Sequence, residues 1–269
     1  MEDAQAYNMQ HQRRGTALIV NVENFRHMSN RHGSNKDVAH LKSALGRLGF
    51  DIVIKNDLLA KEIKEEIKNV AEEDHDNADC FLCAFLTHGD DGVVYGSDSI
   101  QADALTGIDL QTDVFEHFQD QKCKSLIGKP KIFLIQACKP QEDDYSTRGV
   151  STTESISASS TGPDVEEGIR LIIPSGTDFL ICYSTQLGFH SFRSRKEGSW
   201  YISTLCKKMK EVGKDIEFTN ILTKVQGEVA LRTSFSSSND KCTAQKPCFI
   251  SMLTKLLYFP TRQRHSALR

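Results

Sequence analysis

A histidine and a cysteine each stand just beyond an apolar run that predicts a buried β-strand. Residues 80–86 precede His88, and residues 130–138 end in Cys138. Because the carboxyl ends of neighbouring parallel strands meet at one edge of a sheet, we expect the imidazole and the thiol to lie side by side. That pair is what nucleophilic catalysis by cysteine requires. The sequence therefore predicts a cysteine protease.

The elements that must position this pair alternate between strand and helix. Apolar runs predict strands at 17–22, 50–54, 80–86, 130–138, 179–183 and 248–253. Helical spacing predicts helices from a Ser34 or Asn35 cap to a stop at Gly49, over 59–70, around 114–118, and over 200–212 and 216–229. Such alternation indicates an α/β fold, with a mostly parallel sheet and helices on both faces. Active residues should then lie at the carboxyl edge of that sheet.

Composition excludes several other classes of protein. The 269 residues carry a net charge of −3, with 33 basic and 36 acidic side chains. Because there is no basic excess, we expect no nucleic-acid partner. The longest apolar runs are far too short to span a bilayer and residues 1–15 lack a signal core, so we expect a cytoplasmic protein without membrane contact. Several of the eight cysteines lie in apolar runs, and structural disulfides are not expected.

A polar stretch interrupts the strand and helix pattern. Residues 151–162 are mostly serine and threonine, with almost no large apolar side chain to offset the entropy of ordering. We expect a flexible loop that a processing protease could cut; an ordinary surface insertion is the alternative. The predicted organisation is one domain, consisting of a short peptide (1–14), a part with the histidine and cysteine (15–150), a linker (151–164) and a second part (165–269).

The chain resembles a known protease family over nearly its whole length. The resemblance is to short-prodomain effector caspases of an insect-like type, and it is carried in family order by RGTALIVNVENF (14–25), FLTHGDDGVVYG (85–96), GKPKIFLIQAC (128–138), SFRSRKEGSWYI (191–202) and SMLTKLLYF (251–259). It implies a caspase-like three-layer sandwich with a six-stranded sheet. It also implies a zymogen cut into a large and a small subunit, and dimers joined across the final strand.

The resemblance assigns the chemistry residue by residue. Cys138 would be the nucleophile and His88 the proton carrier, while the backbone N–H groups of Gly89 and Cys138 would hold the oxyanion. The binding pocket for a substrate aspartate would comprise Arg31, Gln136 and Arg193, whose donors suit a buried carboxylate. Residues Ser191, Phe192 and Arg193 would pair with the substrate backbone as an added strand.

Partners and processing are likewise implied by the resemblance. The expected substrates are proteins with exposed loops that contain aspartate, cleaved without a metal or organic cofactor. The expected assembly is a homodimer or a heterodimer with another caspase, and inhibitor-of-apoptosis proteins are possible partners. Asp164 is the best candidate processing site, with Asp143 and Asp144 as weaker ones.

Four positions depart from the family pattern. Lys139 and Pro140 replace the usual arginine and glycine after the nucleophile, and Pro140 restricts that loop. His190 and Phe192, which the resemblance also implies as substrate-binding residues of an apolar pocket, stand where tyrosine and tryptophan are common, so we expect an altered pocket. The change at Pro140 motivates a second hypothesis, in which a catalytically weak or inactive homologue regulates an active caspase by dimerising with it.

A third hypothesis is a zinc-binding module. Cys80 and Cys83 have the spacing of half a zinc site, with His88 nearby. Residues three apart on a strand point to opposite faces, however, and no second matching pair follows. This argues against the metal site.

Overall fold

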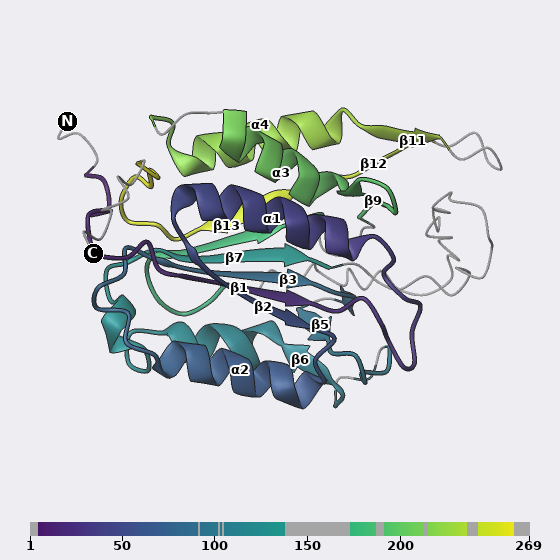
Figure 1. Cartoon of the computed structure of the whole chain (residues 1–269), viewed down its shortest axis with the longest axis horizontal. Coiled ribbons are helices and arrows are strands. Elements are labelled where there is room, and N and C mark those ends of the chain that lie inside the picture. Colours follow the sequence, from purple (N-terminus) through teal and green to yellow (C-terminus); the bar gives the residue numbers. More distant parts are fainter. Residues whose placement is uncertain are drawn as a thin grey trace, which may run out of the picture.

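The fold is a three-layer sandwich in which helices cover both faces of a central sheet (Figure 1). The computed structural model describes residues 5–90, 92–101, 103, 105–137, 173–186, 191–211, 215–235 and 242–260. Within them the sheet has six strands in the order β13-β8-β7-β3-β1-β2. The predicted α/β architecture is therefore confirmed.

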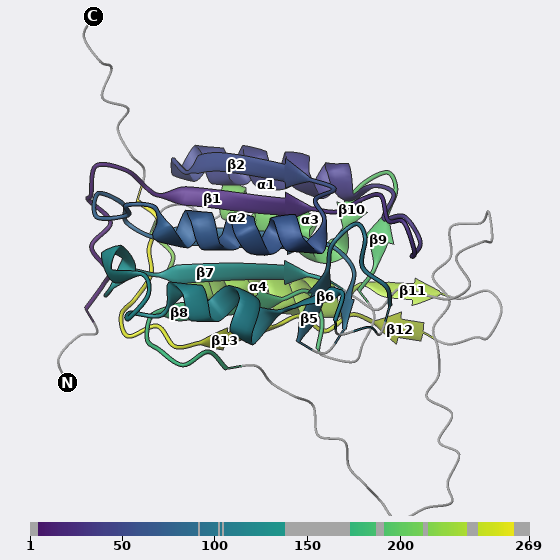
Figure 2. The same ribbon diagram turned by 90° about the horizontal axis from the view of Figure 1, so that it is seen from below.

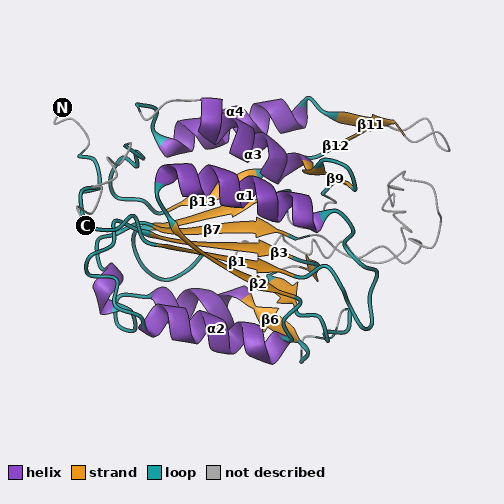
Figure 3. Cartoon of the chain, viewed as in Figure 1, coloured by secondary structure: helices purple, strands orange, loops and turns teal. Residues whose placement is uncertain are grey.

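The sheet is parallel except at one edge. Its strands are β1 (Thr16–Asn21), β2 (Asp51–Asn56), β3 (Phe81–Leu86), β7 (Lys131–Gln136), β8 (Phe179–Tyr183) and β13 (Cys248–Ser251). Strand β13 pairs antiparallel with β8, and the other neighbours in the sheet pair parallel. All six predicted strands exist, and their ends differ from the predicted ones by at most two residues. The arrowheads of β1, β3 and β7 point to the same side of the molecule (Figures 1 and 3).

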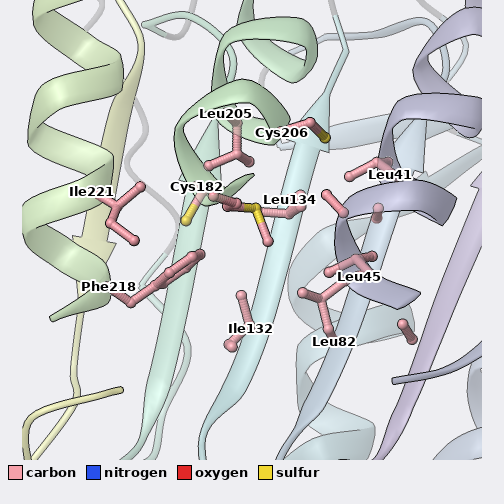
Figure 4. Close-up of a cluster of buried hydrophobic side chains, with 14 of the residues drawn as sticks. Leu41, Leu45, Leu82, Ile132, Leu134, Cys182, Leu205, Cys206, Phe218 and Ile221 are labelled. Atoms are coloured by element: carbon pink, nitrogen blue, oxygen red, sulfur yellow. The ribbon is translucent and has the colours of Figure 1, made fainter. Parts of the chain in front are cut away.

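Side chains alternate along each central strand between two separate hydrophobic cores. On β7, Ile132 and Leu134 face one core, whereas Phe133 and Ile135 face the other. The first core lies under α1 (Ser34–Leu48), α3 (Trp200–Glu211) and α4 (Phe218–Ala230), and its packing is shown in Figure 4. Because both faces are covered, β1, β3 and β8 are apolar over nearly their whole length rather than alternating with polar residues.

The second core lies under α2 (Ala60–Glu72) and three short turns. These are a π-helical turn, η1 (Leu110–Val114), and two 3₁₀ turns, η2 (Phe115–Phe118) and η3 (Lys124–Leu126). Figure 2 views the molecule from the side of this layer. The helix predicted around 114–118 is thus two short turns of other helical types. No helix in the described part of the chain is long and apolar enough to cross a membrane.

Helix α1 ends as predicted but begins differently. Gly49 follows it with φ 88°, the left-handed conformation that commonly ends a helix. The expected Ser34 or Asn35 cap is wrong, because Ser34 is the first helical residue and Gly33 precedes it. Gly33 has φ 92°, and a Cβ there would lie 2.8 Å from the Cα of Arg195. Close packing against the 193–199 hairpin therefore sets the start of this helix.

The sequence pattern did not predict three small sheets. They are β4 (Gly89–Asp90) with β5 (Val93–Tyr95) and β6 (Gly107–Asp109), β9 (Arg193–Ser194) with β10 (Gly198–Ser199), and β11 (Thr233–Phe235) with β12 (Cys242–Ala244). Strand β9 lies on the side toward which the central strands point (Figure 1). Short hairpins thus surround the carboxyl edge of the main sheet.

The N-terminal segment packs into the domain although its composition is polar. Tyr7 and Met9 are buried in the first core, and Ala6 forms a parallel bridge with Leu256. The Tyr7 hydroxyl donates a 2.5 Å hydrogen bond to Asp178, which lies just before β8. Residues near the start of the chain thereby contact both Asp178, before β8, and Leu256, after β13.

Candidate active site

The two strands expected to carry the catalytic pair are adjacent and parallel. Leu86 pairs with Gln136 at the ends of β3 and β7, and the Thr87 N–H donates to the Gln136 carbonyl at 3.1 Å. His88 and Cys138 therefore each follow the same strand pair by two positions. Cys138 itself lies outside the described residues, as do Lys139 and Pro140.

His88 is held on both sides by its neighbours. Its carbonyl accepts the Tyr95 N–H at 3.0 Å, and the Thr87 hydroxyl donates to the Tyr95 carbonyl at 2.6 Å. The ring of Phe25 lies 4.8 Å from the imidazole, centroid to centroid. The β4–β5 hairpin and one aromatic ring thus fix the backbone and the ring of His88.

A backbone carbonyl defines the tautomer of the neutral His88 imidazole. Nε2 of His88 lies 2.9 Å from the Ser29 carbonyl oxygen. A carbonyl oxygen can only accept, so Nε2 carries a hydrogen. In the neutral imidazole, Nδ1 is then the ring nitrogen without a hydrogen. Ser29 escaped the sequence analysis because any residue can supply a carbonyl group.

Gly89 lies unusually close to the end of β7. A Cβ at this position would stand 2.6 Å from the Val93 carbonyl oxygen and 3.1 Å from the Ala137 Cβ. Ala137 immediately precedes Cys138. A glycine is therefore required by the close packing of this residue against β5, and it also lets the backbone after His88 lie against the Ala137 side chain.

The proposed pocket residues come from three separate segments that are linked by hydrogen bonds. Gln136, at the end of β7, donates from Nε2 to the Ser191 hydroxyl oxygen at 2.9 Å. Arg193 donates from Nε to the His32 carbonyl at 3.1 Å, one residue beyond Arg31. The structure thus brings the end of β7, the 191–193 segment and the Arg31 loop into one neighbourhood.

Arg31 is fully buried beside the carboxyl end of β1. Its Nη1 lies 3.5 Å from the carbonyl of Val22, which follows β1 directly. Its backbone N–H donates to Glu23 at 2.8 Å, and its carbonyl accepts the Ser34 N–H at 3.1 Å. The guanidinium is therefore held within the protein rather than solvated at its surface.

A buried carboxyl group lies near both pocket arginines. Asp37, in the first turn of α1, accepts the Ser199 N–H at 2.7 Å and so fixes the hairpin that carries Arg193. Burial raises the pKa of Asp37 above its usual range, while the Ser199 bond and the charges of Arg31 and Arg193 oppose that rise. Sequence reasoning missed Asp37, which has the appearance of an ordinary first-turn acid.

Phe192 contributes packing rather than an exposed pocket wall. It is 5% exposed, and its ring stacks on Trp200 at 4.7 Å. The Phe192 carbonyl accepts the Trp200 N–H at 3.0 Å. His190, the linker 151–164 and the candidate processing sites Asp143, Asp144 and Asp164 lie outside the described residues.

Buried thiols in the described core are unsuited to nucleophilic attack. Burial raises the pKa of Cys83 and Cys182 far above the usual range, and that of Cys206 to about 12. The positions of Cys80 and Cys83 rule out the zinc site suggested by their spacing. Cys80 faces the core under α1 and Cys83 the core under α2, so these two sulfurs cannot bind one ion.

Comparison with known proteins identifies the family of this chain. A family model described as "Caspase domain" matches residues 14–258. Caspase-6 of Mus musculus is 39% identical over 265 residues, covering 96% of this chain and 93% of that protein. Caspase-7 of Gallus gallus is 38% identical over 259 residues, covering 94% and 79%. Caspase-3 of Mesocricetus auratus is 38% identical over 259 residues, covering 94% and 87%. The chain therefore belongs to the caspase family of cysteine endopeptidases.

Proposed function

We propose that this protein is an aspartate-specific endopeptidase that acts as an effector caspase in apoptosis, with Cys138 as nucleophile and His88 as proton carrier. One observation carries the proposal. The parallel register of β3 and β7 pairs Leu86 with Gln136, so both catalytic residues leave the sheet at the same edge. The close approach of Gly89 to Ala137 supports it from the backbone.

The proposed reaction uses the imidazole twice. The Cys138 thiolate attacks the scissile carbonyl, and the Nδ1–H of protonated His88 delivers its proton to the departing amine, leaving a thioester. Water then attacks the thioester as Nδ1 accepts a proton, and the carboxylic acid product leaves. The N–H groups of Gly89 and Cys138 would stabilise the oxyanion formed in each step.

Aspartate specificity is proposed to come from buried cationic groups. Arg31 is fully buried, and Arg193 is fixed through its bond to the His32 carbonyl. A short substrate carboxylate would accept directed, charge-assisted hydrogen bonds from these guanidinium groups. The extra methylene of glutamate would misplace the same charge, because the donors are held by backbone contacts. Glutamate should therefore be a poor substrate residue.

Activation and assembly are proposed from the resemblance. Cleavage at Asp164 would separate the two subunits of the zymogen. Strand β13 supports a homodimer or a heterodimer with another caspase, since it is an edge strand whose residues Cys248 to Ile250 are only half-buried. Substrate proteins with exposed aspartate loops, inhibitor-of-apoptosis partners and a cytoplasmic location complete the proposal.

Peptide cleavage tests the proposal. The purified chain, cut in its linker and dimeric, is assayed on matched fluorogenic peptides that end in Asp, Glu or Asn. We expect cleavage after Asp, and cleavage after Glu slower by on the order of 100-fold or more. Mass spectrometry of the expressed chain should show self-processing at Asp164.

Two cysteine variants serve as the controls. Cys138→Ala should abolish peptide cleavage and self-processing. Cys123→Ala, at a buried free thiol in the second core just before η3, should retain both. Absence of cleavage by the dimeric parent would refute the enzyme proposal and favour the regulator hypothesis that Pro140 motivates.

A further inference from the structure

Gln245 is a fully buried glutamine that no part of the proposed mechanism uses. It lies between β12 and β13 with 0% exposure. Its Nε2 donates to the Ser184 carbonyl at 2.5 Å and to the Ser191 hydroxyl oxygen at 2.9 Å. Its Oε1 accepts the Phe192 N–H at 2.9 Å. One carboxamide thus makes three hydrogen bonds, two of them to residues proposed to bind substrate.

The orientation of this carboxamide is unambiguous. The Phe192 N–H can only donate, so it must face Oε1, and the Ser184 carbonyl can only accept, so it must face Nε2. Ser184 directly follows β8, and its N–H donates to the Ile135 carbonyl of β7 at 2.9 Å. Gln245 therefore anchors the 191–192 segment to the sheet through a rigid neighbour.

The same carboxamide sets the direction of hydrogen bonding at Ser191. The Ser191 oxygen accepts one N–H from Gln245 and one from Gln136, both at 2.9 Å. A hydroxyl has two acceptor lone pairs and one hydrogen, so the Ser191 O–H is left only to donate. If the Gln136 amide were turned over, Ser191 would donate to Gln136 and the Gln136 N–H groups would be released instead. In both orientations a donor hydrogen remains for the pocket.

We propose that Gln245 is a positioning residue: it holds Ser191 so that the Ser191–Gln136 pair presents donor hydrogens to the carboxylate of the substrate aspartate. The inference rests on the proposed function, since it concerns the pocket of that enzyme. Gln245 touches no substrate itself and acts through Ser191. The hydrogen bond from the Phe192 N–H to Gln245 fixes the position of the 191–193 segment.

Variants at Gln245 and Ser191 test the inference in the linker-cut dimer. Hydrogen bonds to a charged group are strong enough that losing one lowers binding by about tenfold or more. Gln245→Met should raise KM for an Asp-ending peptide by about tenfold, with kcat changed less than about threefold. Ser191→Ala should raise KM similarly. In the Ser191→Ala background, Gln245→Met should add no more than about threefold, because both changes break one chain of bonds.

Two further variants separate positioning from general damage. Gln245→Glu keeps an acceptor for Phe192 but loses both donors, and it should raise KM at least as much as Gln245→Met. Gln226→Met removes a comparable bond, from Nε2 to the Pro247 carbonyl at 3.2 Å, without touching the 191–193 segment. It should leave KM unchanged. Active-site titration with an Asp-ending peptide chloromethyl ketone counts the folded sites in each preparation.

Several outcomes would overturn the inference. These are an unchanged KM in Gln245→Met with intact sites, an additive double variant, or an equal effect of Gln226→Met. Hydrogen exchange at the Phe192 amide provides a readout that needs no catalysis. Exchange there should accelerate at least tenfold in Gln245→Met and stay unchanged in Gln226→Met. If the parent failed to cleave Asp peptides, the proposed function would fall, and unchanged exchange would refute the positioning role separately.

Discussion

Replacing Gly89 with alanine should damage the active site with limited loss of stability. The new Cβ would lie 2.6 Å from the Val93 carbonyl oxygen, where ordinary contacts begin at 3.4 Å, so the backbone must move by about 0.8 Å. A misplacement near 1 Å costs on the order of 100-fold in rate when it affects the reacting geometry. We therefore expect kcat for an Asp peptide to fall about 100-fold. Overpacking should lower the free energy of unfolding by about 1–3 kcal/mol.

The assay compares kcat with the unfolding free energy from urea titration in the same preparations. Gly227→Ala is the matched control, because a Cβ at this position in α4 meets nothing within 4 Å. It should stabilise the protein by about 0.5–1 kcal/mol and leave kcat unchanged. A Gly89→Ala enzyme with normal kcat would refute the view that the glycine is needed for the approach to the cysteine loop.

Three further predictions concern stability. Tyr7→Phe should lower the unfolding free energy by about 1.5–3 kcal/mol at pH 7 in urea titration, because buried Asp178 loses a hydrogen bond. Burial alone would raise the pKa of Asp178, but hydrogen bonds from Tyr7 and Thr254 hold this pKa below its usual range. A carboxyl group of this kind stabilises the fold above its unfolded pKa, and the stabilisation is lost as the pH falls through the folded pKa. The difference in unfolding free energy between Tyr7→Phe and the parent should therefore shrink in acid. Asp37→Asn should gain stability relative to the parent as the pH rises. Burial raises the pKa of Asp37, so the parent loses unfolding free energy as the pH rises from the unfolded to the folded pKa of this carboxyl, whereas the asparagine variant does not. Urea titrations that show the opposite trend would contradict this. Leu134→Ala should cost about 2–5 kcal/mol of unfolding free energy, whereas Leu231→Ala, 84% exposed, should stay within about 0.5 kcal/mol.

The sheet could be predicted because its strands are buried on both faces. Continuous apolar runs such as Phe81–Leu86 admit few other interpretations, and helices with regular apolar spacing follow the same logic. The adjacency of β3 and β7 was expected because His88 and Cys138 stand at the ends of two apolar runs, and the parallel pairing of these strands confirms it. Their register, which pairs Leu86 with Gln136, was not predicted, because it depends on contacts between residues far apart in the sequence.

The supports of the site could not be predicted, because they depend on contacts between distant residues. The Ser29 carbonyl, the Asp37 carboxyl and the Gln245 carboxamide reach their partners across 59, 162 and up to 61 positions of sequence. No local pattern marks such residues. The start of α1 was mispredicted for the same reason, since its packing against the hairpin at Arg195, rather than a capping side chain, determines it.

The proposed pocket is assembled from both halves of the chain, and this bears on activation. The first half supplies Asp37 and Gln136, which bond to Ser199 and Ser191 of the second. Strands β7 and β8 pair directly, and Tyr7 bonds to Asp178. Each of these contacts joins residues on opposite sides of positions 138–172. A cut within that stretch would therefore leave the sheet and these pocket contacts joined. Activation by such a cut would have to act through the new chain ends and the cysteine loop, and not by assembling the domain.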